Sequence, residues 1–141
     1  MLDNVFFFLK TKDQVQFLYG MMSLSQALDA LQACHFTAMP VINQEGEYIG
    51  TLSEGDCLWY ILEHPDDKES PIQDLLRDDY MSACTINEPI ADLFQRSLKQ
   101  NFVPIVDDRN IFIGIVTRQK ILSFLMEQLK DAQIIIQTKE N

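Results

Sequence analysis

The spacing of apolar positions changes repeatedly between a helical period and a strand period along the chain. Apolar residues recur at helical spacing over 23–34 and again over 90–100, so both stretches predict amphipathic helices. Short apolar runs bounded by turn residues predict strands, and the turn at 44–46 joins two of them as a hairpin. We therefore expect strands at 15–18, 38–42, 48–52, 84–86, 103–106 and 111–116, and helices at 23–34, 54–62, 90–100 and 118–129.

This pattern occurs twice. Segment 39–61 aligns with segment 103–125 without a gap, at a constant offset of 64 positions. The preceding helices align at an offset of 66, because the second repeat is about two residues shorter between its helix and the next strand. An internal repeat of this length indicates two copies of one structural unit. The 64-residue offset superimposes a proline, a glycine and a hydroxyl residue in turn, placing Pro40 on Pro104, Gly50 on Gly114 and Ser53 on Thr117.

Each unit is expected to follow the order strand, helix, strand, strand, helix, which is an α+β fold. A unit of about 50 residues cannot bury the apolar face of its sheet alone, so we expect two units packed sheet to sheet about a pseudo-twofold axis. The first repeat with an N-terminal arm is expected at 1–63, a polar linker with a short helix (71–77) at 64–79, and the second repeat with a C-terminal tail at 80–141. The apolar tail segment 134–136 fits a longer helix, an added strand or a dimer contact.

Composition and charge narrow the possible classes of function. Hydrophobic residues make up 47% of the 141 residues, which is enough for a core, and the formal net charge is −10. This acidity argues against general binding of nucleic acids and of anionic membrane surfaces, since both require clustered cations. An anionic small ligand would therefore need a locally basic pocket.

Other features predict a cytoplasmic protein. The apolar run at 5–9 is too short for a signal peptide and is preceded by an acidic residue, Asp3, where such peptides carry positive charge. No segment approaches the roughly 18 apolar residues of a membrane helix. Cys34, Cys57 and Cys84 are odd in number and form no CxxC motif, so buried thiols are expected in place of disulfides or a zinc site.

Both repeats resemble cystathionine-β-synthase (CBS) domains, and the chain resembles a stand-alone CBS pair, or Bateman module. The marks are MPV at 39–41 and VPI at 103–105, each followed by an Ile-Gly pair and then by a hydroxyl residue that opens the last helix. The stretch FTAMP at 36–40 is similar to small Gram-positive CBS-pair proteins, including ones that bind cyclic di-AMP. The resemblance covers about residues 10–129, and it implies a tandem CBS-domain fold and a non-catalytic sensor of adenine nucleotides.

The resemblance also implies where a nucleotide would bind. Family ligands lie in clefts between the repeats, where apolar and backbone groups hold the base, an aspartate takes the ribose hydroxyls, and a hydroxyl residue with a following arginine meets phosphate. Lys12 is preferred to Lys10 as a further phosphate contact, because it lies closer to the first strand. Carried over onto this sequence, the nucleotide-binding residues are Lys12, Val15, Phe36, Thr37, Ala38, Met39, Pro40, Ser53, Asp56, Phe102, Val103, Pro104, Thr117 and Arg118.

Ser53 and Asp56 have two interpretations. A hydroxyl residue followed three positions later by an acid resembles a capping box, which stabilises a helix start by about 1 kcal/mol. A carboxylate in the same place can accept two hydrogen bonds from a ribose diol. The second repeat has Lys120 in place of the aspartate. We therefore hypothesise one main nucleotide site, with its ribose on Asp56 and a phosphate contact from Thr117 and Arg118.

The expected function is regulatory. An adenine nucleotide of the AMP, ADP or ATP type would bind between the repeats as a regulatory ligand and alter the affinity for an unidentified effector protein. Cyclic di-AMP and S-adenosylmethionine are alternative ligands, although Gln119 stands where cyclic di-AMP binders tend to carry a second arginine. A structural or dimerisation module without a ligand is a further alternative. The sequence contains no recognisable catalytic or metal-binding motif, so no enzyme activity, metal or required cofactor is expected, and a homodimer formed through the helices is expected.

Overall fold

The computed structural model describes residues 4–140 of the chain, including side chains up to residue 133. Short 3-10 helices at Val5–Phe7, Lys12–Gln14 and Ile72–Leu75 lie in the segments that precede the two repeats. The α-helices are Leu24–Cys34 (α1), Glu54–Glu63 (α2), Ile90–Ser97 (α3) and Arg118–Glu140 (α4). The strands are Lys10–Thr11 (β1), Leu18–Tyr19 (β2), Ala38–Ile42 (β3), Tyr48–Ser53 (β4), Cys84–Thr85 (β5), Phe102–Val106 (β6) and Phe112–Thr117 (β7).

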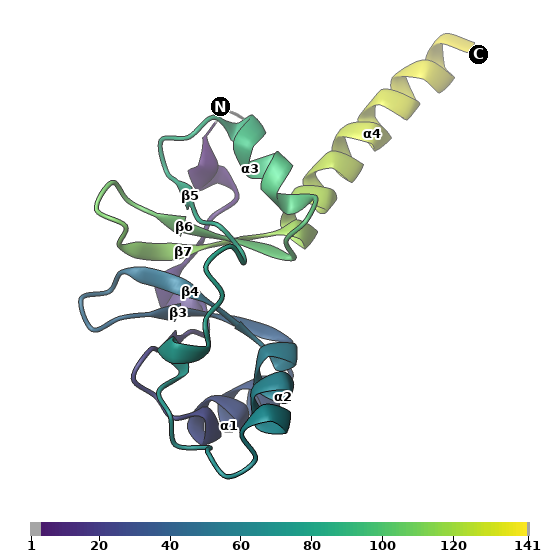
Figure 1. Ribbon diagram of the computed structural model, residues 1–141. Coiled ribbons are helices and arrows are strands. Elements are labelled where there is room, and N and C mark those ends of the chain that lie inside the picture. Colours follow the sequence, from purple (N-terminus) through teal and green to yellow (C-terminus); the bar gives the residue numbers. More distant parts are fainter. Residues whose placement is uncertain (1–3, 141) are drawn as a thin grey trace.

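The strands form two sheets that face each other across the middle of the molecule (Figure 1). The first sheet has the order β2-β3-β4, with β2 parallel to β3 and β3 antiparallel to β4. The second has the order β1-β7-β6-β5, in which β5 and β6 are parallel and β6 and β7 antiparallel. Pro40 pairs with Thr51, and Pro104 pairs with Ile115, so the two hairpins have equivalent registers. The duplicated sequence therefore forms a duplicated backbone.

Helices cover the outer face of each sheet, and apolar clusters hold the layers together (Figure 1). A cluster around Leu31 fills the space between the first sheet and its helices, and one around Leu93 does the same for the second sheet. Between the sheets, Tyr48 and Phe112 stack with ring centroids 6.4 Å apart. Each sheet thus buries both faces, which a single repeat of this size cannot achieve.

The segments that precede the two repeats cross over to the opposite repeat. The N-terminal arm (residues 4–17) precedes the first repeat, but its Val5 and Phe8 are buried in the core of the second. Its strand β1 pairs with β7 at the edge of the second sheet. The linker (residues 64–79) precedes the second repeat, but its Ile72 is fully buried in the core of the first. The arm is therefore part of the second repeat's sheet, although the sequence places it beside the first repeat.

Gly50 and Gly114 lie where the crossing segments pass over the sheets. Their φ angles of +149° and +155° are rarely adopted by residues with a side chain. A Cβ on Gly114 would lie 2.1 Å from the carbonyl oxygen of Lys10, whereas one on Gly50 would lie 3.1 Å from a methyl carbon of Leu76. A backbone oxygen in a strand cannot move aside as a side-chain end can. The arm therefore requires glycine more strictly than the linker does.

The predicted elements are present, with differences at several ends. The strand expected at 15–18 is shorter and later, at β2, because residues 12–14 form a 3-10 helix. The helix expected in the linker at 71–77 is a single 3-10 turn. Helix α3 ends at Ser97, three residues early, whereas α4 continues to Glu140 because no glycine or proline follows residue 129.

Helix α4 projects beyond the rest of the molecule (Figure 1). The backbone of residues 134–136 lies within this helix, while their side chains fall outside the described part of the chain. None of the helices in the described range combines the length and the hydropathy needed to cross a bilayer.

Candidate functional site

A cavity of about 520 Å³ lies between the N-terminal arm and the starts of β3 and β6. We call it the arm cleft, and residues of both repeats contribute to it. An apolar wall with a few polar groups at its edge is typical of small-molecule sites of this size. The wall consists of Val15, Phe36, Ala38, Pro40, Phe102 and Ile115, and the polar edge of Lys10, Gln14, Gln16, Asn101, Thr117 and Gln119.

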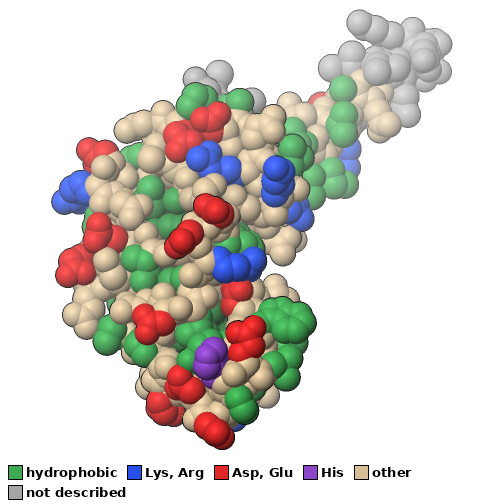
Figure 2. Space-filling model, viewed as in Figure 1, with side chains coloured by type: hydrophobic (Ala, Val, Ile, Leu, Met, Phe, Trp, Pro, Cys, Tyr) green, Lys and Arg blue, Asp and Glu red, His purple; other side chains and the backbone are tan. Residues whose placement is uncertain are grey.

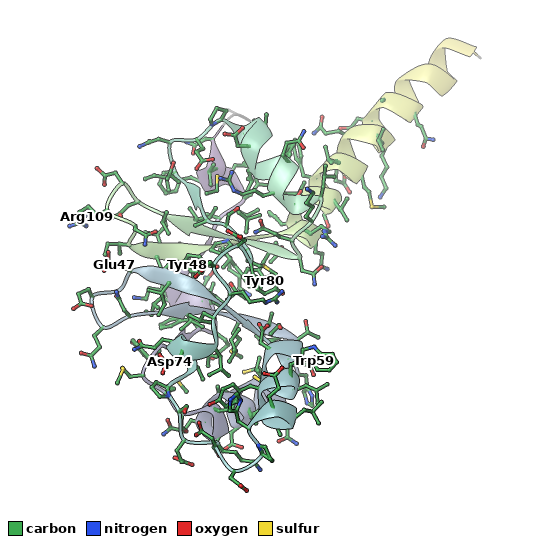
Figure 3. The ribbon with its side chains drawn as sticks, in the orientation of Figure 1. Glu47, Tyr48, Trp59, Asp74, Tyr80 and Arg109 are labelled. Atoms are coloured by element: carbon green, nitrogen blue, oxygen red, sulfur yellow. The ribbon has the colours of Figure 1, made fainter. Side chains whose placement is uncertain are left out.

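A second cavity, of about 500 Å³, lies between the linker and the start of β4. We call it the linker cleft. In Figure 3, Tyr48 and Tyr80 of this cleft lie between the two sheets, and Asp74 lies beside the first repeat. The repeat relates the two clefts, because the offset of 66 that superimposes β2 on β5 places Gln14 and Gln16 of the arm cleft on Tyr80 and Ser82 of the linker cleft. The linker cleft is lined by Tyr48, Ile49, Gly50, Gln73, Asp74, Leu76, Arg77, Asp78, Tyr80, Met81 and Ser82.

The two clefts differ in charge. The lining of the arm cleft contains one charged group, Lys10, together with amides and a hydroxyl. The lining of the linker cleft contains Asp74 and Asp78 beside Arg77. Acidic side chains are spread widely over the face of the molecule in Figure 2, as the net charge of −10 leads one to expect. Within this acidic protein, the arm cleft is the better place for an anionic ligand, because a cation there is not offset by a lining carboxylate.

Two phenylalanines from different repeats line the arm cleft. Phe36 lies two residues before β3, whereas Phe102 is the first residue of β6 and corresponds to Ala38 in the strand pairing. Phe36 remains 46% exposed, although a phenylalanine ring gains free energy by leaving water. The exposed ring provides an apolar flat surface on the cavity, which suits the face of an aromatic ligand.

Thr117 and Arg118 begin α4, but only Thr117 lines the arm cleft. The Thr117 hydroxyl accepts a hydrogen bond from the Lys120 N–H at 3.1 Å. The Arg118 guanidinium donates to the Ser97 carbonyl at 2.7 Å and to the Asn101 side-chain oxygen at 3.0 Å. Arg118 thus ties α4 to the end of α3, and the structure does not bring it into the arm cleft.

Ser53 and Asp56 form the capping box that local sequence predicts. The Ser53 hydroxyl accepts from the Asp56 N–H at 3.1 Å, and the Asp56 carboxylate accepts from the Ser53 N–H at 3.0 Å. The same carboxylate pairs with Arg77 Nε at 2.8 Å. Ser53 and Asp56 lie outside the lining of the arm cleft. The arrangement places Asp56 beside the linker cleft through Arg77, and not in the lining of the arm cleft with Phe36 and Thr117, with which the sequence hypothesis grouped it.

Lys10, not Lys12, faces the arm cleft. The ammonium of Lys12 lies 5.2 Å above the ring of Phe17, where it makes a cation–π contact. Residues 12–14 form a 3-10 turn, which the strand pattern did not predict, and the turn changes which side chains face the cleft. The residues missed on the arm, Gln14 and Gln16 among them, follow from this turn and from no motif in the sequence.

Four other predicted residues do not line the arm cleft. The side chains of Met39 and Val103 are buried in the cores of their own repeats, and Pro104 is buried within β6. The Thr37 carbonyl accepts from the Glu54 N–H at 2.9 Å at the start of α2. Of the predicted set, the structure brings together Val15, Phe36, Ala38, Pro40, Phe102 and Thr117, and it adds Lys10, Gln14, Gln16, Asn101, Ile115 and Gln119.

The buried ionisable groups do not form a reactive centre. Burial raises the pKa of the Cys57 and Cys84 thiols to about 11, so both are neutral and poorly nucleophilic at neutral pH. Burial also raises the pKa of Tyr48 to about 12, and its hydroxyl donates to the Met81 carbonyl at 2.7 Å. Among the described residues, no three histidine, cysteine or acidic side chains gather as metal ligands would.

Comparison with known proteins places both repeats in one family. The CBS domain family matches residues 11–63 and 72–127 of the chain. A curated relative, the A-adding tRNA nucleotidyltransferase of Aquifex aeolicus (strain VF5), is 29% identical over 110 residues, which are 77% of this chain. The chain spans only 13% of the length of that relative.

Solved structures of CBS pairs share the whole fold. CbpB in complex with c-di-AMP is 21% identical, with a TM-score of 0.85 over 94% of this chain and 90% of that one. A CBS domain protein from Streptococcus pneumoniae TIGR4 is 25% identical, with a TM-score of 0.80 over 87% and 86% of the two chains. CBSX2 in complex with AMP is 21% identical, with a TM-score of 0.75 over 91% and 98%.

Proposed function

The chain belongs to the CBS-domain family as a tandem pair of repeats, and we propose that it is a non-catalytic regulatory module that binds an adenine nucleotide in its arm cleft. The base would lie between Phe36 and Phe102, and the phosphate would lie toward Lys10 and Thr117. The arm cleft carries this proposal because it combines aromatic surfaces from both repeats with one cation and no lining carboxylate. Stacking of a base on an aromatic side chain contributes about 1–3 kcal/mol.

The related structures support this class of ligand. CBSX2 is described with AMP, and CbpB with c-di-AMP, and both share the fold of this chain. Cyclic di-AMP is the second candidate, because its two bases could each meet one of the two rings, Phe36 and Phe102, that line the cleft. Its two phosphates would find one lysine, Lys10, in the lining, and Gln119 at the edge is neutral. A mononucleotide therefore fits the charge of the arm cleft better.

The regulatory output would act through a homodimer and a partner protein. Exposed apolar side chains lie on the outer helices at equivalent positions, with Leu58 and Leu62 on α2 and Leu122 and Met126 on α4. Trp59, 64% exposed, lies on the outer side of α2 (Figure 3). A face with twofold internal symmetry suits an isologous dimer, and a large apolar patch is typical of an interaction surface. A nucleotide would alter partner affinity by favouring one arrangement of the repeats.

The proposal is tested by calorimetric titration of the full chain with AMP, ADP, ATP, c-di-AMP, S-adenosylmethionine and GTP. We expect an adenine nucleotide to bind and GTP to bind less tightly. Phe36→Ala should weaken binding by about 1–3 kcal/mol, since it removes the exposed ring from the cleft. Phe6→Ala is the matched control, because Phe6 is 54% exposed and lies outside the cleft.

The same titration also identifies the alternatives. Equal losses in the Phe36→Ala and Phe6→Ala variants would place the ligand outside the arm cleft. Binding of c-di-AMP alone would select the second candidate. If none of the six compounds binds, the chain is an interaction module without a nucleotide.

A further inference from the structure

The carboxylate of Asp56 already has a full set of partners. Its Oδ1 pairs with Arg77 Nε at 2.8 Å, and its Oδ2 accepts from Arg77 Nη2 at 3.4 Å. Oδ2 also accepts from the Ser53 N–H and from the Ser53 hydroxyl, at 3.0 and 2.8 Å. The Asp56 side chain is only 10% exposed. The Ser53 bonds belong to the helix cap, but the two Arg77 bonds come from outside the repeat.

Arg77 stands between the linker cleft and Asp56. It lines the cavity, whereas Asp56 does not. Its guanidinium carbon lies 3.8 Å from the centre of the Tyr80 ring, and Tyr80 also lines the cavity. The Arg77 side chain is 52% exposed, so the ion pair is reached by solvent and is weak enough to exchange. Removing Arg77 would open the cavity toward the carboxylate.

The other half has no equivalent of this ion pair. The 64-residue offset places Asp56 on Lys120, and the offset of 66 that relates β2 to β5 places Arg77 on Thr11. Lys120 is exposed, and no ion pair involves it in the part of the chain that the structure describes. The two clefts therefore differ, since only the linker cleft has a carboxylate beside it that an arginine already occupies.

We propose that Arg77 is a latch that blocks access from the linker cleft to the Asp56 carboxylate by pairing with it. A ligand with a vicinal diol, such as the ribose of a nucleotide, binds Asp56 only by displacing the Arg77 guanidinium. The guanidinium presents two N–H donors to the two carboxylate oxygens. The two hydroxyls of a ribose present the same pair of donors. The class of ligand rests on the proposed function, whereas the latch rests on the contacts of Arg77 alone.

The latch is tested by calorimetric titration of the full chain with AMP. If Arg77 pairs with Asp56 most of the time, binding in the linker cleft is weakened in proportion to the fraction of molecules in which the pair is broken. Wild type should therefore show one AMP site per chain, in the arm cleft. Arg77→Ala should reveal a second site, with affinity at least about tenfold tighter than any linker-cleft binding in wild type. Arg109→Ala is the matched control, because it also removes an arginine from an exposed ion pair, with Asp107, far from both clefts.

Further variants keep the latch separate from the arm cleft. Adding Asp56→Asn to Arg77→Ala should remove the gained site. Phe36→Ala combined with Arg77→Ala should leave it, since the arm cleft alone loses binding. Arg77→Gln, which keeps a side chain over Tyr80 without the guanidinium, should also reveal the site. If wild type and the Arg77 variants bind the same number of AMP molecules, the latch is wrong, while binding in the arm cleft still stands. A single site that appears only in the Arg77 variants would support the latch and overturn the proposed function.

Discussion

The arm cleft and the linker cleft are two versions of one construction with opposite charges. Each lies where the segment before one repeat crosses over the sheet of the other repeat. Lys10 is the charged group in the lining of the arm cleft, whereas Asp74 and Asp78 line the linker cleft beside Arg77, and the exposed Lys120 corresponds to the paired Asp56. The same backbone therefore provides one cleft suited to an anion and one in which Arg77 already pairs with the neighbouring carboxylate, Asp56.

This difference separates what the duplicated fold requires from what a ligand would require. Gly50 and Gly114 are both retained because both crossings need a backbone without Cβ. The charged side chains on the crossing segments, such as Lys10 and Asp74, line the cavities and not the cores, so their charges are free to change sign. Residues that are identical in the two repeats thus mark positions that the backbone requires. Residues that differ in charge mark the different ligand preferences of the two clefts.

The largest expected effect concerns the two glycines. Gly114→Ala should lower the free energy of unfolding by roughly 3 kcal/mol or more, since the Cβ meets the Lys10 carbonyl and the φ angle is strained. Gly50→Ala should cost about 1–2 kcal/mol, because Leu76 can move. Urea unfolding measures both. Gly55→Ala is the control, and it should be neutral or stabilising because its Cβ, within α2, would meet only the Ser53 hydroxyl oxygen, at an ordinary contact distance of 3.7 Å. Equal losses at Gly50 and Gly114 would show that the two crossings are equally tight.

The next effect concerns the charge of the arm cleft. Lys10→Asp gives the arm cleft the charge of the linker cleft. Opposite charges about 4 Å apart attract by about 1 kcal/mol in water, so reversal should weaken AMP binding by about 2 kcal/mol, or about thirtyfold. Lys99→Asp makes the same change at an exposed site outside both clefts and controls for net charge. Titration at low salt measures both variants, and an equal loss in the two would mean that net charge, not the cleft, attracts the ligand.

A smaller effect distinguishes the two helix starts. The Ser53 hydroxyl accepts from the Asp56 N–H and donates to its carboxylate, whereas the Thr117 hydroxyl accepts only from the Lys120 N–H. Ser53→Ala should therefore cost about 1–2 kcal/mol of unfolding free energy, and Thr117→Ala about 0.5–1 kcal/mol. Ser123→Ala, at an exposed position inside α4, is the control and should change little. A larger loss at Thr117 would reverse the ranking of the two caps.

Repetition made most of the fold predictable. Two independent copies of the same pattern located β3, β4, β6 and β7 within one or two residues. The crossing of the arm was not predictable, because β1 has two residues and pairs with a strand about a hundred positions away. Local pattern carries no signal for such a contact. The extension of α4 to Glu140 was missed for a different reason. No glycine or proline follows residue 129, so the sequence carries no signal for where this helix ends.

The candidate site was predictable where it lies on strands and unpredictable where it lies on the arm. Phe36, Pro40 and Phe102 flank or lie in regular strands, and the family resemblance pointed to these strand segments as the place that holds the base. The choice between Lys10 and Lys12 depended on a 3-10 turn of three residues, which has no distinctive sequence pattern. Asp56 was expected in one cleft with Phe36 and Thr117, because sequence spacing places it in a helix but does not say which crossing segment lies beside it.

The smallest expected effect concerns the hairpin turns. Asp107 and Asn43 occupy equivalent positions, and each accepts a hydrogen bond at 2.9 Å from the N–H four residues on, Ile111 and Glu47 respectively. The Ile111 N–H, with further help from the Arg109 N–H, holds the pKa of Asp107 below its ordinary value of 3.8. Only the second turn therefore has a carboxylate at this acceptor position.

Because the folded pKa of Asp107 is lowered, its contribution is complete above pH 3.8 and is lost as the pH falls through the folded value. Asp107→Asn should flatten the acid limb of stability against pH, since the neutral amide keeps the acceptor oxygen, as Asn43 does. The reciprocal Asn43→Asp should steepen that limb by giving the first turn the charge of the second. Urea unfolding between pH 3 and pH 6 measures both slopes. If the wild-type and Asp107→Asn limbs coincide, the two turns are equivalent in energy, and the asymmetry between the repeats is confined to the clefts.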